Sequence, residues 1–285
     1  MNTARIYRLT GLLGVAIGWL FGGIDANAQI ESRDLTVDDP RPVAEAIFRM
    51  IRQYPTIVTY EDPRYVYSED IQDVTERVRR NASDTGRRIL VPKGGPLQVT
   101  YEVNTDSNQP VSCANVLAAI LQAARVNPSG GRFAVKQQGE MFHVVPAQVR
   151  DISGKWVQQT PILDTPITLY VEQQDYHQLI EAIVAEVSKA SGEKVVLYDD
   201  QFAPSFANRI GRVNATNQPA RDVLMTALHA MSDRFTYRLL YDPGVKYYGL
   251  NLHLAAEPPQ EPAPTHAQPV PDGPSPARGR RSERN

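Results

Sequence analysis

Two pairs of adjacent carboxylates stand at matching places in this 285-residue chain. Glu61-Asp62 follows the apolar run at residues 56–60, and Asp199-Asp200 follows the similar run at residues 194–198. Carboxylates held close together can share the acid and base roles of catalysis. Acidic residues also commonly end strands and begin turns, and no nucleophile or orienting base accompanies either pair. The pairs are candidates for a catalytic or ligand-binding site, and strand ends are the simpler interpretation.

Three further residues could do chemistry. His177 and Glu181 are four residues apart, so they share a helix face and could donate two metal ligands, although an exposed polar pair is commoner. Cys113 is the only cysteine, so the chain cannot form an intrachain disulfide. We expect this thiol to be partly buried, unpaired and slow to react. The sequence predicts no cofactor and no metal site.

Basic residues cluster between residues 77 and 93, where Asp84 is the only acid. The cluster comprises Arg77, Arg79, Arg80, Arg87, Arg88 and Lys93. Such a cluster is either a solvated loop or a docking patch for an acidic partner or anionic lipid headgroups. The chain as a whole has a net charge of −2, which gives no electrostatic reason to expect a nucleic acid as partner.

An internal repeat is the clearest signal of architecture. Asn-Gln-Pro at residues 108–110 and again at 217–219 precedes a helical Val-Leu pair, and Glu-Ala-Ile at 45–47 and again at 181–183 leads another helix. Matching anchors in the same order indicate a duplicated unit. The first copy carries an insertion at about residues 63–96.

The second copy shows its elements most clearly. A strand at 166–171 precedes a helix capped by Asp175 and ended by Gly192, and a short strand follows at 195–198. A strand at 209–213 leads to a second helix, with Asn217 as the expected cap, and a hairpin closes the unit. The first copy has the same order. The sequence predicts an α+β fold of two tandem two-layer modules, each β-α-β-β-α-β-β with its helices on one sheet face.

The hairpin at the end of the second copy suggests a place where a partner could bind. Its last strand, at residues 247–252, is expected to be the outer one and to offer free N–H and C=O groups. A partner strand could add there by β-augmentation, with Tyr247, Leu250 and Leu252 as candidate anchors.

The two ends of the chain differ in composition from the repeat. Residues 1–28 have Arg5 and Arg8, an apolar run and an Ala-Asn-Ala site before Gln29, which predicts a secretory signal peptide. Residues 257–285 are rich in proline and end in arginines, which predicts a disordered basic tail. The expected organisation is therefore module 1 at 29–150, module 2 at 151–256, and these two ends.

Residues 166–254 resemble the short N-terminal domain of secretins and TonB-dependent receptors. The resemblance rests on the strand before the first helix, on Ala190-Ser191-Gly192 before the next strand, and on the helix at 223–228 running into the strand at 235–237. It implies a small periplasmic module that binds other envelope proteins and catalyses nothing. The first copy matches only through the internal repeat. Because the two modules and the two ends account for all the residues, we expect neither a secretin pore nor an outer-membrane barrel in this sequence.

These observations predict an exported, non-enzymatic interaction protein of the bacterial cell envelope. Its partners would be other envelope proteins, in association with a secretin or TonB-type system. The alternative is a periplasmic enzyme or small-ligand binder that uses a cleft between the modules. A deep pocket lined by Glu61, Asp62, Asp199 or Asp200 would favour that alternative, and an open sheet edge would favour the interaction protein.

Overall fold

The computed structural model describes residues 30–54, 56–79, 86–104, 112–126, 130–198, 209–232 and 234–255. The expected signal peptide, the basic tail, Arg80 and the Asp199-Asp200 pair lie outside these residues. Helices and strands both contribute to the fold, which confirms the α+β class. Within the described ranges, no helix has the length and apolar character needed to cross a membrane.

The chain contains two modules with the same order of elements. Module 1 consists of β1 (Ile30–Asp39), α1 (Pro42–Gln53), β2 (Val58–Glu61), β5 (Gly95–Asn104), α3 (Cys113–Arg125), β6 (Arg132–Gln138) and β7 (Met141–Arg150). Module 2 consists of β9 (Pro166–Asp175), α4 (Tyr176–Ser191), β10 (Val195–Tyr198), β11 (Ile210–Pro219), α6 (Ala220–Met231), β12 (Phe235–Asp242) and β13 (Tyr247–Leu254). The strand β8 (Trp156–Gln158) and the 3-10 turn η2 (Ile162–Asp164) connect them.

Strand pairing is the same in both modules. The first and third strands form an antiparallel ribbon, which is β1–β5 in module 1 and β9–β11 in module 2. The second strand pairs in parallel with the last one, as β2–β7 and as β10–β13. The last two strands form an antiparallel hairpin, as β6–β7 and as β12–β13. Each element of one module therefore has a counterpart in the other.

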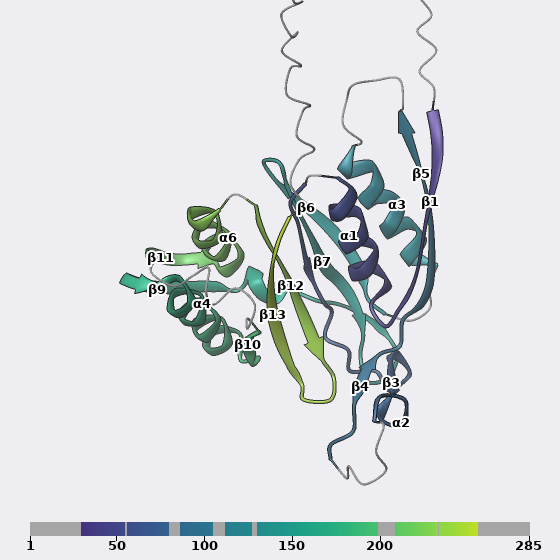
Figure 1. The fold of residues 1–285 in the computed structure, drawn as a ribbon. Coiled ribbons are helices and arrows are strands. Elements are labelled where there is room, and N and C mark those ends of the chain that lie inside the picture. The colour runs from purple at the N-terminus through teal and green to yellow at the C-terminus, as the bar shows by residue number, and fades with distance from the viewer. Residues whose placement is uncertain are drawn as a thin grey trace, which may run out of the picture.

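A single sheet runs through both modules in the order β10-β13-β12-β2-β7-β6, with β8 added to β7. The modules join where β12 lies parallel to β2, with Arg238 beside Tyr60 and Leu239 beside Glu61. Figure 1 shows α1 and α3 on one side of this sheet and α4 and α6 on the other. One face of the sheet is therefore covered in module 1 and the opposite face in module 2.

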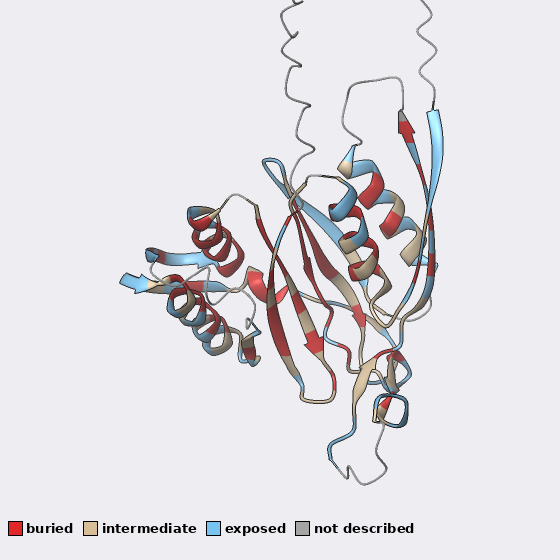
Figure 2. Ribbon diagram, viewed as in Figure 1, coloured by how far each residue is buried: buried red, intermediate tan, exposed pale blue. Residues whose placement is uncertain are grey.

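Each pair of helices buries an apolar stripe against the sheet. In α1 this stripe includes Ile47 and Met50, and in α4 it includes Leu179 and Ile183. Figure 2 shows the buried residues concentrated where the helices meet the sheet. The ribbons β1–β5 and β9–β11 pack on the helices and do not join the sheet. They give each module a third layer, whereas the sequence predicted two.

The ends of the helices show which local signals the fold uses. Asp175 caps α4 by accepting a hydrogen bond from Gln178 N–H at 2.9 Å, and Gly192 ends the helix in the left-handed region at φ 74°. Asn217 does not cap α6, because β11 continues to Pro219 and Asn217 sits at φ 52° where the β11–β9 register shifts. Asparagine tolerates this conformation better than most residues do.

The insertion of module 1 forms small elements of its own. These are η1 (Ser68–Asp70), β3 (Ile71–Asp73), α2 (Thr75–Val78) and β4 (Leu90–Pro92). Buried Asp70 accepts two hydrogen bonds from Arg150 of β7, one of them from Nε at 3.0 Å. The guanidinium of Arg150 also lies 4.8 Å from the ring centre of Tyr67. The start of the insertion is therefore fastened to the main sheet.

Candidate functional site at the junction of the modules

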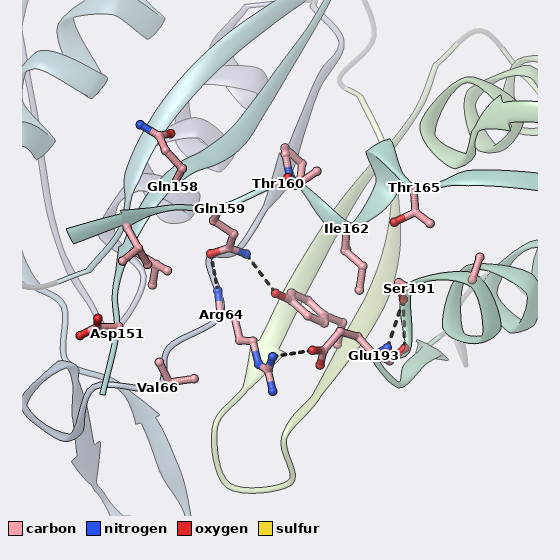
Figure 3. A pocket seen from close by; sticks show the side chains of 15 residues that line it. Arg64, Val66, Asp151, Gln158, Gln159, Thr160, Ile162, Thr165, Ser191 and Glu193 are labelled. Atoms are coloured by element: carbon pink, nitrogen blue, oxygen red, sulfur yellow. Dashed lines mark hydrogen bonds and ion pairs between the residues drawn. The ribbon is translucent and has the colours of Figure 1, made fainter. Parts of the chain in front are cut away.

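A cleft of about 540 Å³ opens beside the junction of the modules. Its walls come from the start of the insertion, from β8 and the connection that follows it, from the C-terminal end of α4 and from β13 (Figure 3). The apolar part of the lining comes from Val66, Val149, Val157, Pro161, Ile162 and Ala190. A cleft of this size between two modules is typical of small-ligand sites.

Polar groups cross one side of this cleft. Arg64 forms an ion pair with Glu193 at 2.5 Å, and its backbone N–H donates to the side-chain oxygen of Gln159 at 3.0 Å. The amide of Gln159 in turn donates to the hydroxyl of Tyr248 at 3.4 Å (Figure 3). This chain of contacts ties the insertion to both modules and gives the cleft a hydrogen-bonding side.

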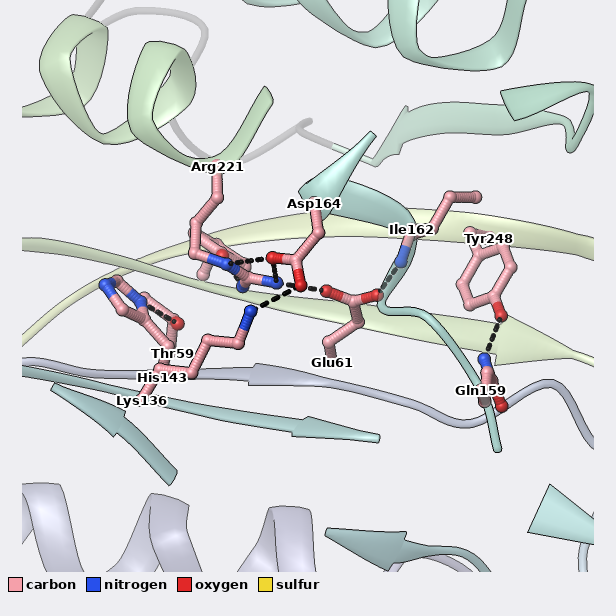
Figure 4. A network of polar contacts seen from close by, with 10 residues as sticks. Thr59, Glu61, Lys136, His143, Gln159, Ile162, Asp164, Arg221 and Tyr248 are labelled. Carbon is pink, nitrogen blue, oxygen red and sulfur yellow. Dashed lines mark hydrogen bonds and ion pairs between the residues drawn. The ribbon is translucent and has the colours of Figure 1, made fainter. Parts of the chain in front are cut away.

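A buried polar network lies behind the cleft, between β2 and α6 (Figure 4). Glu61 is fully buried and accepts a hydrogen bond from Arg221 of α6 at 2.9 Å. Its other oxygen accepts the backbone N–H of Ile162, a residue that also lines the cleft. Arg221 further donates to Asp164 at 3.1 Å and to the hydroxyl of Tyr237 at 2.8 Å. The network therefore joins module 1, module 2 and the connection between them.

Asp62 makes a second connection of the same kind. It is fully buried, forms an ion pair with Arg41 at 2.6 Å and accepts a hydrogen bond from the hydroxyl of Tyr60 at 2.8 Å. Its carboxylate also accepts the backbone N–H of Tyr241 on β12 at 3.0 Å, and Arg41 donates to the carbonyl of the same residue at 2.7 Å. Asp62 thus holds β12 of module 2 against module 1, and Glu61 holds α6 and the connecting turn η2 there.

The environment of Glu61 favours a structural role over a catalytic one. Burial raises the pKa of its carboxyl, and the Arg221 guanidinium and the Ile162 N–H oppose that rise. Each carboxylate oxygen has a partner within the protein, and neither Glu61 nor Asp62 lines the cleft. This cleft therefore does not use Glu61 or Asp62, because partners within the protein surround both carboxylates. The other two residues of that hypothesis, Asp199 and Asp200, lie outside the described residues.

His143 of β7 belongs to the same layer of buried polar groups. Its Nδ1 lies 2.8 Å from the hydroxyl of Thr59, and its Nε2 lies 3.3 Å from the side-chain oxygen of Gln138. Burial, with the nearby positive charge of Arg221, lowers its pKa to about 4. The side chain is only 1 % exposed, so the imidazole is neutral at physiological pH.

The predicted outer strand is not at an edge of the sheet. β13 lies between β12 and β10, because β10 pairs in parallel along its far side. Leu250 and Leu252 are buried in the core of module 2, and Tyr247 is half-buried with its hydroxyl on that of Tyr198. The prediction of a free edge at 247–252 is therefore wrong. A hairpin seen in a sequence does not reveal that an earlier strand pairs outside it.

The sequence did not predict that β6 is an edge strand of the sheet. Within the described residues, β6 pairs only with β7, and most of its side chains are exposed. The sequence shows β6 and β7 as a hairpin but does not show which of the two is outermost. The order follows from the parallel pairing of β2 with β7, a contact between residues far apart in the chain.

The basic residues of the insertion mostly contact the protein itself. Arg79 donates to the carbonyls of Gly86 and Arg87, and Arg87 donates to the carbonyl of Gly244 in the β12–β13 turn. Arg88 forms an ion pair with Asp73 at 2.6 Å. Arg77 is exposed. These contacts favour a loop that is held against the rest of the protein. The docking patch for an acidic partner or anionic lipid headgroups stays a prediction.

The lone thiol is half-buried at the start of α3. Burial raises the pKa of the Cys113 thiol, and a hydrogen bond with Thr56 opposes that rise. Partial burial is confirmed, and slow reaction with thiol reagents stays a prediction. His177 and Glu181 face each other at 3.6 Å, and the described part of the chain contains no group of three or more His, Cys, Asp or Glu residues placed to hold a metal ion.

Three comparisons with known proteins gave no match. No protein family, no curated protein and no solved structure matches this chain.

The buried pair of Glu61 and Arg221 gives a first prediction. Replacing Arg221→Met leaves a buried carboxylate without its cation, which should lower the free energy of unfolding by about 3–5 kcal/mol. The double variant with Glu61→Leu should recover part of that loss, because it removes the unpaired charge. Urea unfolding measures both, with Arg49→Met as control, since its pair with Glu45 is exposed and should cost less than about 1 kcal/mol. A loss for Arg221→Met as small as that of the control would contradict the argument.

His143 gives a second prediction. Because folding lowers its pKa from the ordinary 6.5 to about 4, the unfolded chain binds more protons between these pH values. Stability should therefore fall as the pH drops from about 6.5 towards 4, by up to about 3 kcal/mol from this residue. In His143→Gln the fall should be smaller. Equal pH profiles for wild type and His143→Gln in chemical unfolding would refute this.

Proposed function

We propose that this chain is an exported, non-enzymatic protein-interaction module of the bacterial cell envelope, which binds partners by accepting a strand at the edge of β6. The observation that carries the proposal is this exposed edge strand of seven residues at the end of a continuous sheet. An exposed edge offers unpaired N–H and C=O groups along its length, and strand addition is a common mode of peptide recognition.

The pairing of β6 with β7 identifies which groups point outward. Residues across an antiparallel pair alternate between positions that exchange hydrogen bonds and positions that do not. Phe133 lies opposite Pro146, which has no N–H, so this position cannot exchange both bonds. By alternation, Val135 and Gln137 are of the same kind. The backbone groups of these three residues therefore point away from β7, towards an incoming strand.

The class of partner follows from the sequence. The expected signal peptide favours export, and the resemblance of residues 166–254 to the short domain of secretins and TonB-dependent receptors favours envelope proteins as partners. Proteins of a secretin or TonB-type system are the first to test. Strand addition needs no catalytic group, which agrees with a non-enzymatic role.

The edge of β6 gives a third prediction. Replacing Val135→Pro removes an outward N–H without removing any bond to β7, so it should abolish the retention of strand-adding partners from envelope extracts. Val135→Thr keeps the N–H and the β-branched shape and should retain them. Mass spectrometry of the retained proteins compares the three chains, and circular dichroism checks that each is folded. A partner set that is unchanged in a folded Val135→Pro chain would contradict the proposal.

A second candidate function is the binding of a small ligand in the cleft. The observation in its favour is the apolar lining beside a short row of hydrogen-bonding groups. The two carboxylates of the cleft are already engaged, because Glu193 pairs with Arg64 and Asp151 accepts hydrogen bonds from Ser153. The lining therefore suits a neutral, mainly apolar molecule.

The cleft gives a fourth prediction. A neutral apolar dye, N-phenyl-1-naphthylamine, should bind with an increase in its fluorescence. Val157→Phe narrows the cleft and should weaken binding at least about tenfold, since it fills space that the dye would occupy. Ile152→Phe is the matched control, because Ile152 is 85 % exposed and does not line the cleft. Equal affinities for the two variants would remove this candidate.

A further inference from the structure

The junction inside the chain shows how the outermost strands of two copies could pair. β12 of module 2 lies beside β2 of module 1, and the pairing pattern makes β6 the counterpart of β12 and β10 the counterpart of β2. β6 and β10 are also the two outermost strands of the main sheet. Within the described residues these two edges have no further strand beside them, and they are the same two kinds of strand that already pair inside the chain.

We propose that β6 of one copy of this chain pairs in parallel with β10 of a second copy, as β12 pairs with β2 within the chain. This inference rests on the proposed function, because it takes the acceptance of a strand at β6 as given and names that strand.

The backbone of β10 is suited to this role. Tyr248 N–H donates to the carbonyl of Lys194, so alternation directs the groups of Val195 and Leu197 away from β13. The hydroxyl of Ser188 accepts the N–H of Val195 at 2.9 Å, and its single proton is shared between the carbonyls of Val184 at 2.9 Å and Val195 at 3.2 Å. Leu197 then presents its N–H and C=O at the free edge of β10, within the described residues.

The register of the new contact follows from the one inside the chain. Tyr241 lies opposite Tyr248 in module 2, and Gln137 lies opposite Phe142 in module 1. Tyr248 and Phe142 are counterparts, because they lie beside Val195 and Val58, which face the helices of their own modules. Gln137 and Tyr241 are therefore counterparts as well. Two residues before them lie Val135 and Leu239, which correspond in the same way.

In β10 and β2, Tyr198 and Glu61 each come three residues after the counterparts Val195 and Val58, so they correspond too. Leu239 lies beside Glu61 in the internal junction. Val135 of one copy should therefore lie beside Tyr198 of the next. Both side chains can be reached by a second copy, since Val135 is 38 % exposed and Tyr198 is 48 % exposed.

The internal contact also predicts the form of the assembly. Along the sheet, the strands of module 1 follow in the same order as their counterparts in module 2 but run in the opposite direction. The modules are thus related by about half a turn around an axis across the strands, with a shift of three strands, or about 14 Å. A repeated rotation of this kind with a shift does not close, so the assembly should be an open chain of copies rather than a ring.

The contact between copies should be weaker than the one inside the chain. The buried Val-Leu pairs at 116–117 of α3 and at 223–224 of α6 correspond, so Ala114 of α3 stands where α6 has Arg221. The buried ion pair that closes the internal junction has no equivalent between copies. Association should therefore be reversible and should increase with protein concentration.

Disulfide trapping tests the register directly. In a Cys113→Ser background, the double variant Val135→Cys with Tyr198→Cys should give a ladder of covalent dimers, trimers and larger species on oxidation. A mixture of the two single variants should give a covalent dimer and nothing larger, and each single variant alone should stay monomeric. Dimers from Val135→Cys alone would mean that two β6 strands pair with each other, which would overturn the proposal.

Sedimentation velocity of the unmodified mature chain tests the association without cysteines. The mean mass should rise from that of a monomer at micromolar concentration to more than a dimer near millimolar concentration. Folded Val135→Pro chains should stay monomeric, and so should folded Leu197→Pro chains, but an equal mixture of the two should contain dimers. If the wild type stays monomeric throughout and the double-cysteine variant gives no ladder, the self-association is wrong. Capture of another envelope protein that depends on Val135 would then still support strand addition at β6.

Discussion

The buried ion pair between Glu61 and Arg221 is the contact on which the arrangement of the two modules depends. Moving a charged side chain out of water costs several kcal/mol. A buried ion pair is therefore tolerated only when its remaining donors and acceptors also have hydrogen-bond partners. Here the partners come from β2, α6, β12 and the connecting turn η2, and all must be in place together. The pair therefore contributes less to net stability than to the choice of one arrangement over others.

That choice matters because the backbone contact at the junction is short. β12 and β2 lie side by side over only two pairs of residues, and so short a parallel contact would not fix a register by itself. Asp62 adds to it by accepting the N–H of Tyr241 while it pairs with Arg41. The side chain of Thr236 also donates to the carbonyl of Val58 at 2.5 Å. Polar groups with fixed directions thus set a register that apolar packing alone would leave loose.

Much of each module could be predicted from the sequence, because its signals are local. The apolar spacing of α4, the cap at Asp175 and the stop at Gly192 need only neighbouring residues, and the structure has all three. The cap at Asn217 failed because a shift of register in the β9–β11 ribbon, a contact between distant strands, determines the backbone there. Strand order across the modules has the same character and could not be deduced from periodicity.

The misplaced site has a related cause. Thr59, Glu61 and His143 form a polar face on β2 and β7, and in a separate two-layer module such a face would be exposed to water. A carboxylate pair at the end of a strand then suggests an accessible site. The continuous sheet brings α6 over this face, and its Arg221 turns an apparent surface into a closed polar core. The type and spacing of residues were informative, but their exposure depended on the partner module.

The same reasoning bears on β6, one of the two outermost strands in the described part of the sheet. Exposed edge strands usually carry charges or prolines that discourage pairing with other chains. The only charges in β6 are those of Arg132 and Lys136, and Lys136 is held by Asp164 at 2.5 Å, on the polar face. No proline interrupts the strand, and its one irregularity lies at its first residue, between Arg132 and Phe133. An edge this long and this weakly protected would risk aggregation unless the chain uses it for pairing, which is the physical reason to look for a strand that belongs there.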